Sequence, residues 1–340
     1  MEEISMTKST TPVMSYAELT LPLPEAKELW LAKTSKEWKS QFLLRSAGQS
    51  KRTPSLGDLI HDITLLSANH QRLDTQYVIS IYLHGYWSLI SEWRRLCVVH
   101  RSNTFSDSSQ DGPNLLLNLR HQELCKNLRK FQNDWYAVHS PKEALLLNLD
   151  FMNLYSSLND LQVFTGKEGE EQARQIYPTL QSWAESTDGR QSVWHAGQIL
   201  RQAKAFPPGH LREFYAIAVY QATLTIWSYS VVTRTTRNQP VMNTGSREEI
   251  LYLDDIESAG VQQFISYGQG RPAIRGPLPK GNHQRYVEAS LDDPRSCMSI
   301  SVDIIRANCS SGKDILAPVV ENLCQLINQL GNAAWAIGLG

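Results

Sequence analysis

The sequence predicts an all-α protein, a large multi-helix domain of packed antiparallel helices with one long Gly/Pro-rich irregular segment. Apolar residues recur at steps of three and four along most of the chain, which is the period of amphipathic helices. Proline and glycine fall at the joints between these stretches, and no alternating strand pattern separates them. At 340 residues, with 41% hydrophobic and 20% charged residues, the chain can bury a large core.

Helix signals divide the chain into a short entry segment and one large domain. Residues 1–21, rich in Ser, Thr and Met, are expected to form a flexible N-terminal segment, and residues 22–337 a single helical domain. Pro24 suits the first turn of a helix, and Ser55 with Asp58 has the spacing of a capping box. The predicted helices are 24–43, one that opens at Ser55, and then 73–100, 114–138, 144–164, 168–183, 188–206, 214–231, 294–307 and 313–336.

Residues 234–295 differ in character from the helical stretches on either side. Gly, Pro and Asn become frequent there, and only a short helix near Glu248 is suggested. Such a composition is typical of extended segments on a protein surface. We therefore expect an irregular, partly ordered segment within the helical domain.

Composition excludes several classes of protein. A net charge of −1 gives no field that would attract a polyanion, so nonspecific nucleic-acid binding is not expected. The basic side of 114–138 is interrupted by Glu123 and Asp134, which favours a solvated helix face over a phosphate-binding stripe. Neither a signal-peptide core near the start nor a long apolar run occurs, so we expect neither secretion nor a membrane span.

The five cysteines are widely spaced and mostly set in apolar patterns, which is typical of reduced, buried thiols in an intracellular protein. No Cys-x-x-Cys pair occurs, and no Cys pair is followed by a His pair at zinc-finger spacing. We expect no metal site and no cofactor in this chain.

Catalytic motifs are absent or incomplete, so the chain is not expected to be an enzyme. Ser311-Gly-Lys-Asp314 matches part of a phosphate loop, but the earlier glycine is missing and Asp314 replaces the Ser or Thr that binds magnesium. Gly268-Gln-Gly270 has two of the three glycines of a dinucleotide-binding turn, yet Pro272 follows and no strand or helix is evident around it.

The all-helical terpene synthases are the most serious enzyme alternative. They bind magnesium between an acidic cluster and an Asn-Asp pair that is followed at fixed steps by Ser and Glu. Here Asn159-Asp160 is followed instead by Val163 and Lys167, and the acidic run 254–257 comes after the pair, in the Gly-rich stretch. Half of the oxygen ligands that magnesium needs are missing, so this alternative is less favoured.

His195, near the centre of the chain, is a candidate ligand or general base because an imidazole titrates near neutral pH. No Cys or carboxylate lies three or four residues away to orient its ring. We therefore interpret His195 as a core histidine that hydrogen-bonds to backbone. Trp194 is interpreted as a packing anchor beside a close helix approach at Gly197.

Several stretches in the central block carry a pattern that we recognise. They are LQVFTGKEGEEQAR at 161–174, LQSW at 180–183, VWHAGQILR at 193–201, FPPG at 206–209 and FYAIAVYQ at 214–221. Together they resemble the regulatory region of fungal-specific transcription factors, most closely the branch that carries two-Cys two-His zinc fingers at the N-terminus. Outer landmarks agree at 29–38 and 319–334, so the resemblance extends over about 21–337 and is loose only in 234–295.

The resemblance implies an all-helical regulatory domain of a nuclear protein that controls RNA polymerase II transcription. Its partners would be the transcriptional machinery or co-regulator proteins, with a small-molecule effector as a further candidate. DNA binding and zinc would belong to fingers that this sequence does not contain, so we expect a fragment, a truncated gene product or a finger-less family member. The positions that match the family pattern are structural candidates: Gly166, Glu168, Trp183, Trp194, His195, Gly197, Gln198, Arg201, Tyr215 and Tyr220.

A stand-alone helical domain that senses a small metabolite is the main alternative. Its pocket would lie among the aromatic residues of the predicted helices and would shift a population of states when occupied. The candidate lining residues are Tyr82, Trp87, Trp194, Tyr215, Tyr220 and Trp227.

Overall fold

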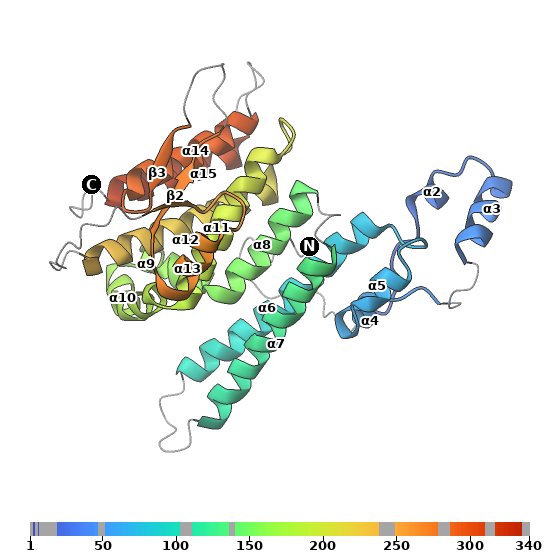
Figure 1. Ribbon diagram of the computed structural model, residues 1–340, viewed down its shortest axis with the longest axis horizontal. Helices are drawn as coiled ribbons and strands as arrows, with labels where there is room; N and C mark the ends of the chain where they lie inside the picture. The colour runs from blue at the N-terminus through green and yellow to red at the C-terminus, as the bar shows by residue number, and fades with distance from the viewer. Residues whose placement is uncertain are drawn as a thin grey trace. The chain divides into compact units, whose positions relative to one another are not determined.

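The computed structural model describes residues 3, 6, 19–46, 52–102, 111–135, 140–237, 249–277, 286–309 and 317–334. Over these residues the protein is predominantly helical, which confirms the predicted fold class, and it contains one small sheet (Figure 1). The chain divides into two compact units, Met1–Asp150 and Phe151–Gly340, and each is described by itself. The single domain over 22–337 stays a prediction. Among the described helices none is long and apolar enough to cross a membrane.

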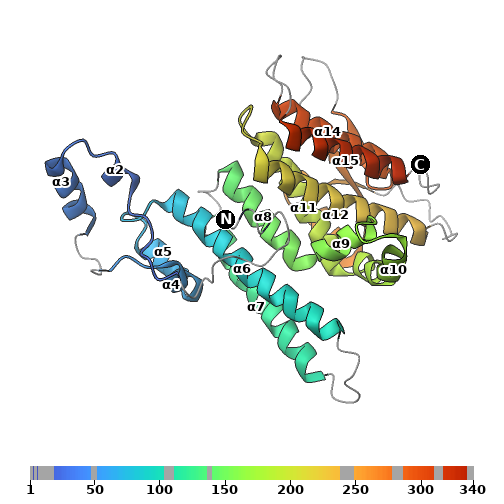
Figure 2. The same cartoon turned by 180° about the vertical axis from the view of Figure 1, so that it is seen from behind.

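The first unit is built on two long antiparallel helices that run side by side, α6 and α7 (Figures 1 and 2). The Tyr86 hydroxyl on α6 donates to the Leu124 carbonyl on α7 at 2.7 Å, and the Trp93 indole donates to the Leu117 carbonyl at 3.0 Å. The helices of this unit are α2 (Lys27–Trp30), α3 (Ser35–Ser46), α4 (Leu56–His61), α5 (Thr64–Ala68), α6 (Thr75–Ser102), α7 (Asp111–Trp135) and the first part of α8 (Pro141–Tyr155).

Helix α4 begins where the sequence predicts. The Ser55 hydroxyl accepts from the Asp58 backbone N–H, and the Asp58 carboxylate accepts from the Ser55 backbone N–H at 2.8 Å, which completes the capping box. The predicted helix 24–43 is instead two short helices, α2 and α3. No side chain of α3 is buried.

The second unit packs helices around α11 and α12, which lie side by side (Figures 1 and 2). Helix α12 is buried along most of its length, as its dense small and aromatic residues predict. After the end of α8, the elements of this unit are α9 (Leu158–Phe164), α10 (Glu170–Glu185), α11 (Thr187–Ala205), α12 (Glu213–Arg237), β1 (Ile250–Tyr252), α13 (Ala259–Tyr267), β2 (Arg271–Arg275), β3 (Glu288–Ser290), α14 (Pro294–Cys309) and α15 (Pro318–Ala334).

The segment expected to be irregular, 234–295, contains a small sheet and a helix. In the sheet of order β1-β2-β3, β1 pairs parallel with β2 and β2 pairs antiparallel with β3. Leu251 lies opposite Pro272 in the first pairing, and Ile274 lies opposite Ala289 in the second. The strands have only three to five residues, so no alternating pattern is long enough to indicate them in the sequence. The helix suggested near Glu248 lies outside the described residues.

The start of α10 differs slightly from the prediction. Gly169 has φ +109° and precedes the first helical residue, Glu170, whereas the sequence pattern places the start at Glu168. Glu168 therefore lies in the turn before the helix, and the acids of the first turn are Glu170 and Glu171. Glycine is required at position 169 because a side chain is strained at this φ.

Candidate functional site

Helix α11 begins in a tight turn after α10. The Ser186 side chain accepts from the Gly189 backbone N–H at 3.1 Å and caps the helix, while Asp188, the first residue of the predicted helix 188–206, lies in the first turn. A Cβ atom at Gly189 would lie 2.2 Å from the Trp183 carbonyl oxygen. Only glycine fits here, and this fit fixes the direction in which α11 leaves α10.

Gly197 lets the loop after β1 approach the backbone of α11. A Cβ atom at this position would lie 2.4 Å from the Leu253 Cβ and 2.5 Å from the Leu253 carbonyl oxygen, far inside any real contact. The close approach predicted at Gly197 therefore exists, but its partner is a loop that follows a strand and not another helix.

The next two motif residues bind the same loop through its main chain. The Gln198 side-chain amide donates to the Leu253 carbonyl at 2.7 Å and to the Asp255 carbonyl at 2.8 Å. The Arg201 guanidinium donates to the Asp255 carbonyl and to the Gln198 side-chain oxygen, both at 3.3 Å. Gln198 follows Gly197 directly, and Arg201 lies four residues after Gly197 and three after Gln198. All three residues therefore lie on one face of α11.

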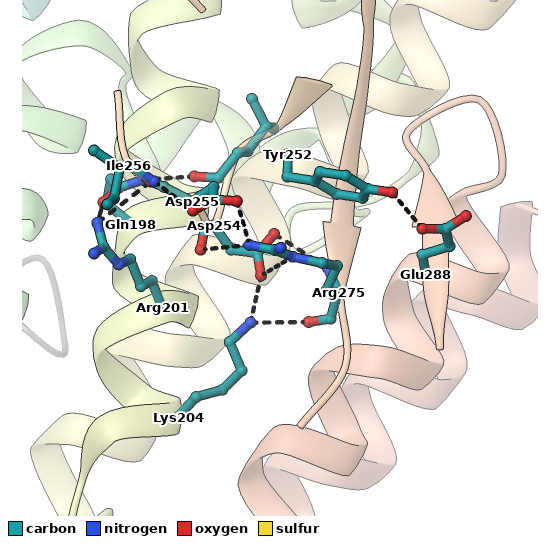
Figure 3. Close-up of polar contacts among 10 residues, drawn as sticks. Gln198, Arg201, Lys204, Tyr252, Asp254, Asp255, Ile256, Arg275 and Glu288 are labelled. Atoms are coloured by element: carbon teal, nitrogen blue, oxygen red, sulfur yellow. Dashed lines mark hydrogen bonds and ion pairs between the residues drawn. The ribbon is translucent and has the colours of Figure 1, made fainter. Parts of the chain in front are cut away.

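Next to these contacts lies a group of charges around the buried Asp254 carboxylate, shown in Figure 3. We call Lys204, Asp254, Asp255 and Arg275 the Asp254 cluster. The Asp254 side chain has no exposed surface, and its carboxylate forms ion pairs with the Lys204 ammonium and, at 3.4 Å, with the Arg275 guanidinium. Arg275 also pairs with the Asp255 carboxylate at 3.0 Å, and Lys204 donates to the Arg275 carbonyl at 3.2 Å. The cluster thus connects α11, the loop after β1 and strand β2.

Tyrosine rings and a further acid extend the cluster along the sheet. The Arg275 guanidinium carbon lies 4.6 Å from the centroid of the Tyr252 ring and 5.7 Å from that of Tyr286, which are cation–π distances. The Tyr252 hydroxyl donates to the Glu288 carboxylate on β3 (Figure 3). All three strands therefore contribute to one polar network.

Ionisation within the network follows from these contacts. The hydrogen bond to Glu288, followed by burial, raises the pKa of the Tyr252 hydroxyl above its ordinary value. The backbone N–H of Ile256, and then Arg275, lower the pKa of Asp255. Burial opposes the charge on Arg275, but the carboxylates of Asp254 and Asp255 outweigh it and raise the pKa of the guanidinium. Both shifts favour the charged forms of Asp255 and Arg275 at neutral pH.

A second anchor joins α11 to the end of α13. The Arg190 guanidinium donates to the Ile265 carbonyl at 2.8 Å and to the Ser266 carbonyl at 3.4 Å. These carbonyls belong to the last turn of α13, where a cation also favours the helix dipole. The segment 249–277 is therefore fixed to α11 at both the first and the last turns of that helix.

The aromatic residues of the motif pack in the helical core. The buried His195 ring stacks on Phe151 with centroids 4.6 Å apart and on Tyr155 at 5.9 Å. Trp194 is also buried. The Trp183 indole donates to the Tyr155 carbonyl at 2.9 Å. All three side chains thus contribute to packing, and the backbone hydrogen bond expected of His195 stays a prediction.

Four of the motif positions lie away from the Asp254 cluster. Gly166, with φ +90°, and Glu168 are exposed in the turn between α9 and α10. Tyr215 and Tyr220 lie on α12, half-buried, and Tyr215 packs on Phe206 with ring centroids 5.1 Å apart. The motif is therefore a set of packing and turn positions, and among them Gly197, Gln198 and Arg201 contact the 249–277 segment.

Sequence reasoning missed the residues that complete the site. Lys204 and Arg275 carry no motif, and Asp254 drew notice only as part of an acidic run. Asn308 on α14 was missed as well, although its side-chain amide donates to the Phe206 and Pro207 carbonyls at 3.0 Å and so fixes the turn between α11 and α12. Nothing local in the sequence indicates such pairings between distant segments.

The polar contacts of this site attach the 249–277 segment to α11. The Asp254 carboxylate, one of the acids weighed as a magnesium ligand, is already paired with two cations. In the part of the chain that the structure describes, no three His, Cys, Asp or Glu side chains gather as metal ligands do. The arrangement joins a sheet and a short helix to the helical core.

The aromatic residues considered for a ligand pocket belong to different units. Tyr82 and Trp87 lie on α6 of the first unit, and both are buried. Trp194 and Trp227 are buried in the second unit, where the Trp227 indole donates to the Leu330 carbonyl at 2.8 Å and packs α12 against α15. Trp194 and Trp227 therefore belong to the packed core of the second unit.

Two known fungal proteins are similar to this chain. A transcription factor of Zymoseptoria tritici is 25% identical over 260 residues, which cover 68% of this chain and 26% of the relative. Transcription factor 1 of Elsinoe fawcettii is 23% identical over 297 residues, which cover 80% of this chain and 30% of the relative. No family model matches the chain, and no solved structure is significantly similar. The chain is similar to part of two fungal transcription factors and spans less than a third of their length.

Proposed function

We propose that this chain is a regulatory domain of a fungal transcription factor, active in the nucleus on RNA polymerase II transcription. The observation that carries the proposal is the similarity to two fungal transcription factors over 68% and 80% of the chain. On this proposal residues 22–337 act as one non-enzymatic domain through protein contacts. DNA binding through zinc fingers would reside outside this chain.

The geometry of α11 supports a role in presenting a surface. Gly197, Gln198 and Arg201, which belong to the sequence motif, bind the 249–277 segment through its backbone, and the Asp254 cluster fixes it further. The segment exposes large apolar side chains, with Ile256 66% and Tyr267 76% exposed. Exposed aromatic and aliphatic groups on a fixed element are typical of protein-binding surfaces.

A reporter assay tests this function. The chain is fused to an unrelated DNA-binding module, and transcription from a promoter carrying its site is measured in fungal cells. We expect the fusion to change transcription relative to the module alone. Arg201→Ala, which removes a contact with the Asp255 carbonyl, should reduce that change, whereas Arg174→Ala on the exposed side of α10 should not. An unaltered reporter with a folded, nuclear fusion would contradict the proposal.

A further inference from the structure

The ends of α6 and α7 expose apolar side chains that nothing in the described chain covers. On α6, Leu96 is 48% and Val99 63% exposed, and on α7, Leu116 is 69% and Leu119 51% exposed. Soluble monomers rarely gather side chains of this kind in one place without a function. Their spacing of three residues on each helix places each pair on one helical face.

The four apolar residues share one side of the helix pair. The Trp93 indole donates to the Leu117 carbonyl at 3.0 Å, so these two positions mark the sides on which α6 and α7 face each other. An α-helix turns by about 100° per residue, so the angle of every other residue follows from these two positions. In two antiparallel helices, residues at similar angles lie on one common side of the pair. We call this side the α6–α7 face. It includes Glu92, Leu96, Val99, Leu116, Leu119 and Arg120, together with the exposed Arg95 and Glu123.

Oppositely charged residues of this face lie at the same height along the two helices. The Trp93 ring also stacks on His121 with centroids 4.9 Å apart, so Glu92 on α6 lies level with Arg120 on α7. Leu96 lies one turn nearer the end of the pair, level with Leu116. Each helix therefore presents charged residues followed by apolar ones along its length, and the acid Glu92 on α6 lies level with the base Arg120 on α7.

We propose that two copies of this chain associate through the α6–α7 face and form a four-helix bundle. A two-fold axis along the helix pair sets α6 of each copy against α7 of the other, so that all neighbouring helices are antiparallel. Leu96 of each copy then packs on Leu116 of the other, and Glu92 of each copy pairs with Arg120 of the other. This self-association goes beyond the regulatory function proposed above and does not depend on it.

Charge complementarity favours a second copy over other occupants. The face is complementary to itself, because Glu92 and Arg120 exchange positions under the two-fold axis and its two acids are balanced by two bases. An acidic protein segment or a nucleic acid would instead meet Glu92 and, one turn beyond Leu119, Glu123. The half-exposed Arg120 pairs with Glu123 at 2.8 Å within one copy and keeps hydrogen-bonding capacity for a partner.

Sedimentation velocity of the full chain at increasing concentration tests the dimer. We expect a monomer–dimer equilibrium, and we expect Leu116→Asp to weaken it on the order of thirtyfold or more, because a charge would enter an apolar contact. Leu44→Asp is the matched control, since Leu44 is 75% exposed on α3 and outside the face. Circular dichroism confirms that the variants fold. A monomeric wild-type chain, or equal weakening by both substitutions, would overturn the proposal.

Exchanged charges test the arrangement itself. Glu92→Arg and Arg120→Glu should each weaken self-association, because either one sets like charges opposite each other. A mixture of the two variant chains should recover the dimer, since both pairs in the mixed dimer are again of opposite sign. A mixture that stays as monomeric as its components would contradict this two-fold geometry, even if the wild-type chain is dimeric.

Discussion

Gly197 of α11 and Leu253 of the loop after β1 meet backbone to backbone. A side chain at position 197 has no room, since even its Cβ would lie 2.4 Å from the Leu253 Cβ. Glycine inside a helix costs about 1 kcal/mol relative to alanine, so its presence here is explained by the approach of the loop. The contact also brings the Leu253 carbonyl within 2.7 Å of the Gln198 amide.

Gly197→Ala should displace the 249–277 segment from α11. We expect the free energy of unfolding to fall by about 2 to 4 kcal/mol, because the added methyl group meets backbone that cannot rotate away. Urea unfolding of the purified chain measures the change. Gly331→Ala on α15 is the control, since its Cβ would meet the Met298 side chain at 3.3 Å and should alter stability by about 1 kcal/mol or less. Equal effects of the two substitutions would contradict this account.

Asp254→Asn should weaken the same attachment through charge. Removing the buried carboxylate leaves the partly exposed Lys204 and Arg275 cations without their shared partner, and we expect a loss of about 2 to 4 kcal/mol. Limited proteolysis within 249–277 should become faster in the variant. Arg174→Ala removes an exposed ion pair with Glu170 and should change stability by less than about 0.5 kcal/mol. If Asp254→Asn is as mild as this control, the cluster does not fix the segment.

Asp150 should make the protein less stable as the pH rises. Its carboxylate oxygens are fully buried and have no hydrogen-bond partner among the described residues, and burial raises the pKa well above 3.8. An acid of this kind stabilises the fold fully below its unfolded pKa and progressively less above it. Asp150→Asn should therefore flatten the decline in unfolding free energy as the pH rises above 3.8. Parallel pH profiles for the two proteins would show that Asp150 is not the cause.

Asp58, in contrast, should make the protein less stable as the pH falls. Hydrogen bonds from the Ser55 backbone and hydroxyl, and then from Arg52, lower its pKa from 3.8 to about 2. The stability that this gives is present above 3.8 and disappears as the pH falls through 2. Because Asp58 is partly exposed, we expect Asp58→Asn to cost about 1 kcal/mol near neutral pH and nothing in strong acid. Unfolding curves at both pH values measure this, and an equal cost at both would refute the capping role.

Local signals in the sequence predicted the helices and part of the site. The capping box at Ser55 and Asp58 was readable because its partners are three residues apart, and the importance of Gly197 and Gln198 came from a resemblance. The sheet was missed because β1 pairs with β2 across an intervening helix and each strand is short. Lys204 and Asp254 are fifty residues apart, so their ion pair exists only in the folded chain.

This separation in sequence has a consequence for the order of folding. The contacts of α11 with 253–255 and with Arg275 join residues 50 to 71 positions apart, and such contacts form only after α11 itself is in place. The sheet and α13 are therefore expected to order after the helices of the second unit and to open before them. Amide hydrogens of β1 and β2 should exchange with solvent sooner than those in the middle of α11 and α12. The surface formed by the sheet and α13 could then detach from the helices of the second unit and bind them again while those helices stay folded.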